Sequence, residues 1–141
     1  MKDIHDKIEV VTMIAPAIID ADNTPAAVDR LNWEAAEVLL HVGAGGITFS
    51  STNKVEFKLT HSDDDSTYVA VTAADLVGAP TVGTGGIIKS LVAEHAVAAN
   101  YQFGYIGNKR YLKLLADFSG THGVGTEIGA WVIKGRPHHA S

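Results

Sequence analysis

The sequence predicts an all-β fold: an antiparallel β-sandwich or jelly-roll-like barrel of about eight short strands, with one short helical turn. Three observations predict this fold class. Short runs of β-branched and other apolar residues recur along the 141 residues, and turn-forming residues separate them. Some runs alternate apolar and polar side chains, which is the pattern of a strand with one buried face. The chain also has 14 glycines, many in pairs or near-pairs between the runs, where they supply turns.

The alternative is an α+β fold in which Trp33–Val42 and Ser90–Ala99 are helical. The alanines and glutamates of the first segment favour a helix. However, Val38, Leu40 and Val42 recur at every second position, and the segment lacks a residue that would cap a helix at its start. We therefore predict that Trp33–Val42 is a strand.

Before this segment, two further strands are expected. Ile8–Ile14 is rich in β-branched residues, and we expect it to end before Pro16, because proline cannot donate a hydrogen bond to a sheet. The Asx residues and proline of Asp20–Pro25 predict a turn. Ala26–Leu31 is expected to form the second strand.

The clearest alternation in the sequence belongs to Lys54–His61. Its apolar residues point one way and its polar residues the other, as in a half-buried antiparallel strand; the apolar residues are Val55, Phe57 and Leu59. His61–Thr67 is expected to be a polar loop and Tyr68–Val71 to be extended. Thr72–Asp75 has a cap-like start and predicts one short helical turn, which ends by Gly78.

The second half of the chain predicts four more strands. Ile87–Ala93 is the first of them. Tyr101–Ile106 and Lys109–Phe118 are expected to form a hairpin around the turn Gly107-Asn108. In the second arm four apolar residues share one face, namely Leu112, Leu114, Ala116 and Phe118. Ile128–Lys134 is the final strand, and we expect proline to keep the residues from Gly135 onward out of the sheet.

The chain is expected to be one domain, because its length suits a single core and no linker interrupts it. Residues 1–7 are predicted to be an extended N-terminal arm, residues 8–135 a single β-sandwich domain, and residues 136–141 a C-terminal tail.

Composition argues against several classes of protein. The 11 basic and 16 acidic residues give a net charge of -5, whereas dedicated nucleic-acid binders usually carry a basic excess. No cysteine is present, which excludes disulfides, zinc–thiolate sites and cysteine nucleophiles. No run approaches the roughly 18 apolar residues of a membrane span. The charged start of the chain does not resemble a signal peptide, so we expect synthesis in a cytoplasm.

Gly83–Ser90 (GTGGIIKS) is one residue away from a phosphate-binding loop. Ile88 stands where the second glycine of that motif belongs, and its β-branched side chain would keep a phosphate away from the backbone. We therefore interpret the stretch as a glycine turn that enters the strand Ile87–Ala93.

Other polar clusters give no chemical signature. His61 with Asp63–Asp65 lacks the ligand spacing of a calcium loop, so a solvated loop is the better interpretation. The seven histidines show no metal-ligand spacing. A small hydrolase that uses His122 and Asp117, with Ser119 nearby, is the weakest hypothesis. We predict no catalytic residue, no cofactor and no metal, and hence no enzyme.

Among the large aromatic residues, Trp33, Trp131 and Tyr111 are expected to pack in the core by default. Any of them that faces outward is a candidate contact, since aromatic side chains dominate interface energetics. Tyr111 is the preferred candidate, because strand alternation places it opposite the Leu112 face.

Five segments resemble small head-decoration or capsid-cement proteins encoded beside the major capsid gene in tailed phages and prophages of Proteobacteria. The segments are Met1–Ile8, His61–Asp65, Thr72–Gly78, Gly104–Leu114 and Ala130–His138. The resemblance spans nearly the whole chain and implies a structural virion protein that binds the outer face of the phage head and stabilises the shell.

The resemblance also implies partners and a location. The expected partners are the major capsid protein and further copies of the chain, as a dimer or trimer, with no nucleic acid and no membrane. The expected location is the capsid surface of the virion. The predicted interface residues are Lys2, Ile4, His5, Tyr111, Arg136 and His138. The alternatives are a carbohydrate-binding jelly-roll module and a head–tail joining or tail protein.

Overall fold

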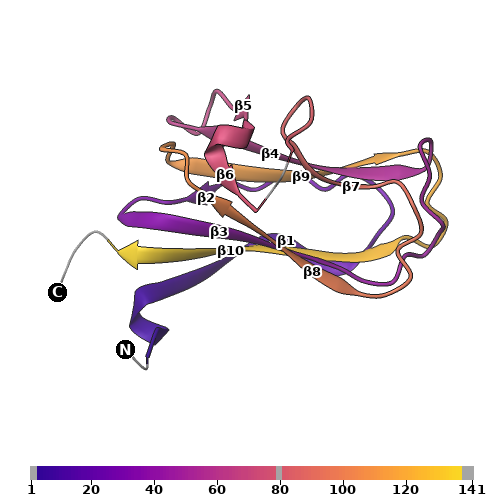
Figure 1. Cartoon of the computed structure of the whole chain (residues 1–141), viewed down its shortest axis with the longest axis horizontal. Helices are drawn as coiled ribbons and strands as arrows, with labels where there is room; N and C mark the ends of the chain where they lie inside the picture. The colour runs from indigo at the N-terminus through magenta and orange to yellow at the C-terminus, as the bar shows by residue number, and fades with distance from the viewer. Residues whose placement is uncertain (1–2, 79–80, 138–141) are drawn as a thin grey trace.

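A computed structural model describes residues 3–78 and 81–137, which form two antiparallel five-stranded sheets packed face to face (Figure 1). The first, called the β1 sheet, has the order β1 (Ile8–Ile19), β10 (Thr126–Pro137), β3 (Trp33–Val42), β8 (Ala99–Tyr105) and β6 (Leu76–Val77). The second, called the β4 sheet, has the order β2 (Val28–Asp29), β9 (Tyr111–Ser119), β4 (Lys54–Ser62) and β5 (Val69–Ala70), with β7 (Ile87–Leu91) also paired to β4. The predicted all-β sandwich is confirmed.

The helical content of the described residues is two short 3₁₀ turns, His5–Lys7 and Ala73–Asp75. The second is the predicted turn, and Thr72 and Asp75 cap it reciprocally. The α+β alternative is wrong, because Trp33–Val42 is a strand over its whole predicted length and 92–98 contains no helix. Among these residues no helix has the length and apolar character of a membrane span.

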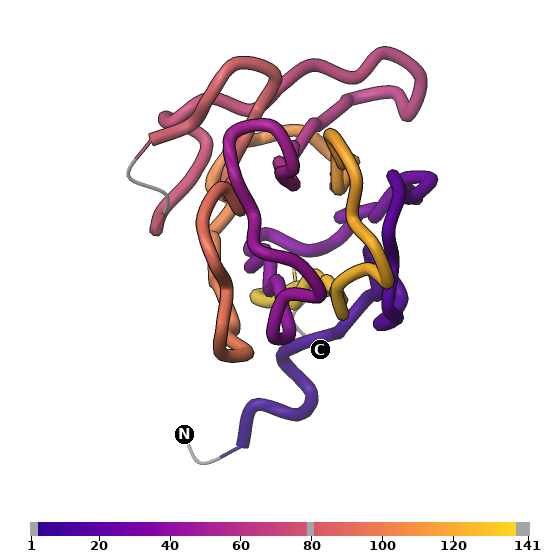
Figure 2. Tube along the Cα trace, turned by 90° about the vertical axis from the view of Figure 1, so that its right-hand side faces the viewer, coloured from indigo at the N-terminus to yellow at the C-terminus, as the bar shows by residue number. Residues whose placement is uncertain are grey.

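In chain order, the strands β1 to β4 and again β8 to β10 alternate between the two sheets, which is the arrangement of a jelly roll. The chain therefore crosses the core repeatedly, and the strands surround it when the molecule is viewed along their length (Figure 2). The central strands of each sheet carry a buried row on their inner face. On β3 and β4 these rows are Val38, Leu40 and Val42, and Val55, Phe57 and Leu59, all 0% exposed.

The predicted hairpin of Tyr101–Ile106 and Lys109–Phe118 is wrong. The two strands exist, as β8 and β9, but β8 pairs with β3 and β6, whereas β9 pairs with β4 and β2. The segment 106–110 thus carries the chain from one sheet to the other. This crossing lets the apolar faces of β8 and β9 meet across the core, whereas in a hairpin they would lie side by side.

Near both ends of the domain, a strand continues through a proline that we expected to end it or to lie outside the sheet. β1 does not end before Pro16 but continues to Ile19, with shifts in its register on either side of Ile14. The strand tolerates the proline because β1 is a sheet edge and the ladder is already irregular there. β10 runs through Arg136 to Pro137, which lies opposite Trp33, so these two residues belong to the sheet and not to a tail.

The Gly83–Ser90 stretch is the glycine turn that the sequence predicts. Gly83 pairs with Ile87 in an isolated bridge, and the chain then enters β7, which ends at Leu91 and not at Ala93. Ile88 is buried in the core, with 6% of its surface exposed. At the position where a phosphate-binding loop has its second glycine, this chain therefore has a side chain that packs in the core.

Candidate interaction face

The outer face of the β4 sheet is charged, and four of its charged side chains form ion pairs. Lys58 Nζ donates to Asp117 Oδ2 at 2.7 Å, and this hydrogen bond raises the pKa of Lys58. Lys54 Nζ lies 3.4 Å from Glu56 Oε2. Long charged side chains of this kind, paired along neighbouring strands, are typical of a sheet face that water covers.

The outer face of the β1 sheet is more apolar in its middle rows, although His41 and Glu127 pair at one end of it. The register places Thr12, Trp131, Leu39 and Gln102 in one outward row, and Val10, Ile133, Glu37, Gly104 and Val77 in the next. We call the apolar members of these rows the apolar face: Val10, Leu39, Val77, Trp131 and Ile133. Val10 and Val77 are 57% and 59% exposed, and the other three are partly exposed. Four strands thus present apolar side chains on both of their faces.

The Trp131 side chain packs close to the sheet because Gly129 has no side chain to obstruct it. A Cβ atom on Gly129 would come within 2.8 Å of the indole ring and 3.1 Å of Pro16. The ring therefore lies along the sheet, over Gly129 and toward Pro16 of the neighbouring strand. Leu39 is the cross-strand neighbour of Trp131 on the same face.

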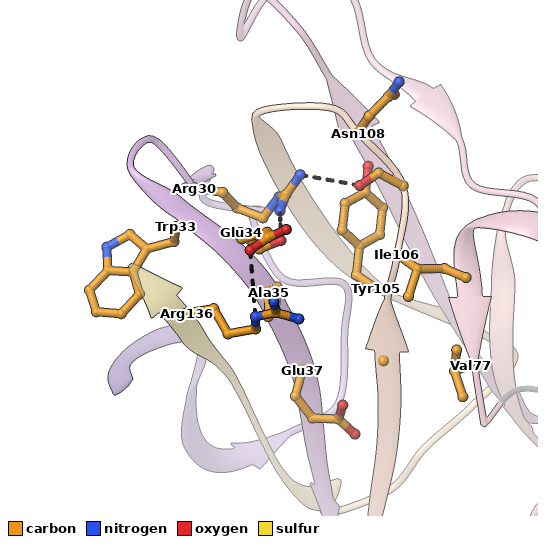
Figure 3. A pocket seen from close by; sticks show the side chains of 13 residues that line it. Arg30, Trp33, Glu34, Ala35, Glu37, Val77, Tyr105, Ile106, Asn108 and Arg136 are labelled. Atoms are coloured by element: carbon orange, nitrogen blue, oxygen red, sulfur yellow. Dashed lines mark hydrogen bonds and ion pairs between the residues drawn. The ribbon is translucent and has the colours of Figure 1, made fainter. Parts of the chain in front are cut away.

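Next to the apolar face the surface is hollowed, with a volume of about 670 Å³ (Figure 3). Glu37 and Gly104 lie in the hollow, and Val77 and Ile106 form an apolar border. Figure 3 shows Trp33 pointing away from it. Burial raises the pKa of the Glu37 carboxyl. Among the described residues no hydrogen bond or ion pair reaches this carboxylate.

Arg30 builds one wall of the hollow. Only 8% of its surface is exposed, and its guanidinium lies 4.7 Å from the centre of the Tyr105 ring. Its Nε and Nη2 donate to the carbonyl of Lys109 at 3.0 and 2.6 Å, Nη2 also donates to Gly107 at 3.3 Å, and Nη1 donates to Glu34 at 3.3 Å. Arg30 thereby ties the crossing between β8 and β9 to the start of β3. Its charge is engaged with backbone carbonyls.

Behind the hollow, a buried polar pair joins the two sheets. Tyr105 Oη lies 2.7 Å from His61 Nδ1 and accepts a hydrogen bond from the Lys109 amide at 3.2 Å. The direction of the hydrogen bond between this hydroxyl and Nδ1 depends on the tautomer of the His61 ring. The other ring nitrogen, Nε2, is 4.0 Å from Asp75 Oδ2. Burial lowers the pKa of His61, and the Asp75 carboxylate opposes that shift.

We expect this histidine to make the fold sensitive to acid. Because the pKa of His61 is lowered in the folded state, the unfolded chain binds a proton on this ring below about pH 6.5, whereas the folded chain binds it only at a lower pH. The free energy of unfolding should therefore fall as the pH drops through that range. Denaturant unfolding at about pH 7.5 and about pH 5.5 measures the loss. A His61→Gln variant should lose less stability between the two pH values; an equal loss would assign the effect to other histidines.

The structure places the predicted interface residues apart. Ile4, 60% exposed, and His5 belong to the N-terminal segment, which leaves the sandwich (Figure 2). Arg136 is exposed beside the hollow, with its Nε 3.5 Å from Glu34 Oε2. Tyr111 lies on the outer face of the β4 sheet, with the Arg110 guanidinium 4.9 Å from its ring centre. Lys2 and His138 lie outside the described residues.

The expectation of core packing for the tryptophans is wrong, because Trp33 and Trp131 are both partly exposed and neither belongs to the buried core. The proposed hydrolase residues are engaged elsewhere. Asp117 pairs with Lys58, and His122 Nε2 donates to the carbonyl of Ser119 at 2.8 Å. Within residues 3–78 and 81–137, no three acidic or histidine side chains are grouped so as to hold a metal ion.

The apolar face was not predicted from the sequence. The signal for it is a doubled apolar pattern. Leu39 and Leu40 are adjacent, and Trp131, Val132 and Ile133 form a continuous run. A strand that is apolar at consecutive positions is typical of a sheet covered on both sides.

No protein-family model matches the sequence, and no curated protein matches it. Among solved structures, the chain is similar to a chain in the structure of infectious bursal disease virus, Gx strain, at 14% sequence identity and a TM-score of 0.26. The alignment covers 93% of this chain and 40% of the viral chain, so this chain spans less than half the length of that neighbour. A TM-score this low supports no argument about function, and the fold is defined by the described strands alone.

Proposed function

We propose that this protein is a structural component of a virion, a capsid decoration or cement protein, and that it binds the capsid through its apolar face. The observation that carries the proposal is the contrast between the two outer faces. One carries the ion pairs Lys54–Glu56 and Lys58–Asp117, and the other presents Trp131, Leu39 and Ile133 as neighbours. The resemblance of the sequence to decoration proteins supplies the identity of the partner.

A contiguous apolar surface on a sandwich this small is a cost to the free molecule unless another surface covers it. The centre of the apolar face is an aromatic and aliphatic group, and polar residues such as Thr12 and Gln102 border it. An apolar centre with a polar rim is the usual anatomy of a protein–protein interface.

A shell suits such a protein because it repeats the same surface many times. Each copy needs only a modest affinity, since many copies together strengthen the whole lattice. The projecting N-terminal segment, residues 3–7, offers a second contact beside the sandwich (Figure 2). A second contact on the same subunit would lower the dissociation of each copy further.

We test the proposal by sedimenting the purified protein with empty shells assembled from the major capsid protein encoded in the same genome. A Leu39→Lys substitution places a charge in the centre of the apolar face and should weaken binding about 100-fold. The matched control is Leu115→Lys, because Leu115 is equally half-buried but lies on the outer face of the β4 sheet. The control should bind as the wild type does.

Two results would contradict the proposal. The first is that the wild type sediments no more with shells than without them and leaves their heat tolerance unchanged. The second is that both leucine variants bind equally well. If Leu39→Lys instead converts a dimer into a monomer and leaves shell binding intact, the apolar face is a contact between copies of the chain.

A carbohydrate-binding module is the alternative that Trp131 suggests, because sugars stack on exposed indole rings. Its cross-strand neighbours are Leu39 and Thr12, and its neighbours along the face are Gly129 and Ile133. Such aliphatic surroundings favour a protein surface over a sugar, which needs several hydrogen-bonding groups beside the ring. A glycan array with specific binding would favour the alternative. Electron microscopy of the virion separates a head location from a tail location.

A further inference from the structure

We propose that the hollow beside the apolar face is a binding site for a basic side chain, arginine or lysine, with Glu37 as its anionic partner. The evidence for the site is the hollow itself, whereas the assignment of the basic side chain to a capsid subunit rests on the proposed function.

The carboxylate of Glu37 lies in the hollow without a partner that neutralises it. It extends over Gly104 of β8, where a Cβ atom would come within 3.2 Å of Oε1. The side chain is partly buried, and no donor among the described residues bonds to it. The two arginines of the hollow are engaged, Arg136 with the Glu34 carboxylate and Arg30 with backbone carbonyls. Figure 3 shows the dashed contacts of both arginines, and none of them ends at Glu37.

A partly buried carboxylate without a partner destabilises the free protein, and a cation that enters the hollow removes this cost. The raised pKa of Glu37 agrees with a charge that burial disfavours and no cation offsets. The border of the hollow suits the aliphatic part of a long basic side chain. Val77 and Ile106 are 59% and 62% exposed there, and the stem of an arginine or lysine would cover them.

Butylguanidinium is the probe for this site, because it combines a cation with a short apolar chain, and 1-butanol is its uncharged control. We expect titration with butylguanidinium to shift the NMR signals of the Gly104 and Val77 amides in a saturable way, with about millimolar affinity. The affinity should fall with added salt. It should also fall as the pH is lowered and Glu37 is protonated.

The decisive variant is Glu37→Gln, which keeps the shape of the side chain and removes its charge. Its affinity for butylguanidinium should be at least about tenfold lower. Glu94→Gln is the matched control, because Glu94 is an exposed carboxylate between β7 and β8 and its replacement changes the net charge equally. The melting temperature of Glu37→Gln should equal or exceed that of the wild type, which shows that the variant is folded.

The proposal is overturned if Glu37→Gln binds butylguanidinium as well as the wild type does, or if 1-butanol produces the same shifts. Sedimentation with shells separates the two hypotheses. If the wild type binds shells and Glu37→Gln binds about tenfold more weakly, both hold. If the wild type does not bind shells but binds the probe, the capsid function fails and the basic-group site stands.

Discussion

An Arg30→Ala substitution is expected to destabilise the fold by about 3 kcal/mol or more, which corresponds to a fall in melting temperature of about 10 °C. The guanidinium donates to the carbonyls of Lys109, Gly107 and Glu34, and it lies against the Tyr105 ring. Its removal leaves these carbonyls without this donor and opens a cavity at the crossing between the two sheets. Denaturant unfolding followed by tryptophan fluorescence measures the loss.

Arg110→Ala is the control for Arg30→Ala. Arg110 makes two short bonds to Asp29, at 2.7 and 2.8 Å, but both side chains are more than two-fifths exposed. An exposed ion pair contributes at most about 1 kcal/mol, since water already solvates both charges. If the two variants lose the same stability, the carbonyl bonds of Arg30 do not hold the crossing between β8 and β9, and another interaction must fix it.

A Gly86→Ala substitution is expected to cost about 3 kcal/mol of stability. Gly86 has a φ of +86°, and a Cβ atom there would overlap the carbonyl oxygen of Leu59 in β4. The same glycine accepts a hydrogen bond from the Leu59 amide at 2.9 Å, so the two backbones cannot separate without losing it. Thermal unfolding monitored by circular dichroism gives the change in stability.

The adjacent residue provides a control for Gly86→Ala. Gly85 has a nearly identical φ of +83°, but a Cβ atom there would meet only the Lys58 side chain, at 3.7 Å. Gly85→Ala should therefore cost about 1 kcal/mol, which is the backbone penalty alone. The difference between the two variants measures the close approach to β4. Equal losses would show that backbone conformation accounts for both.

Sequence patterns predicted the strands well where burial is one-sided. Lys54–His61 alternates cleanly because one of its faces meets the core and the other meets water, and the structure has β4 at nearly the same bounds. The 3₁₀ turn after Thr72 was predictable because its cap is local. Features that depend on one or two neighbouring residues can therefore be predicted from the sequence.

Features that depend on distant strands were not predictable. The hairpin interpretation failed because the turn signal at Gly107-Asn108 is the same whether the chain turns back or crosses the core. In the fold, the crossing is bonded to Arg30, which is 77 residues away from Gly107 in the sequence. The hollow was equally hidden, because it requires Glu37 of β3 to meet Gly104 of β8. The apolar face could have been predicted, because the adjacent Leu39 and Leu40 break the alternation of apolar and polar residues that is typical of a strand with one solvated face.

The irregular edge of β1 has a consequence for how copies of this protein can meet. A long, regular edge strand invites a second molecule to add its own strand and so to begin a growing fibril. Along β1 the ladder slips twice, around Ile14, and Pro16 lacks the N–H that a continuous ladder would use. A neighbour that approached this side would find no uninterrupted partner for its backbone. Crowded copies are thus discouraged from polymerising side by side, even where their local concentration is high.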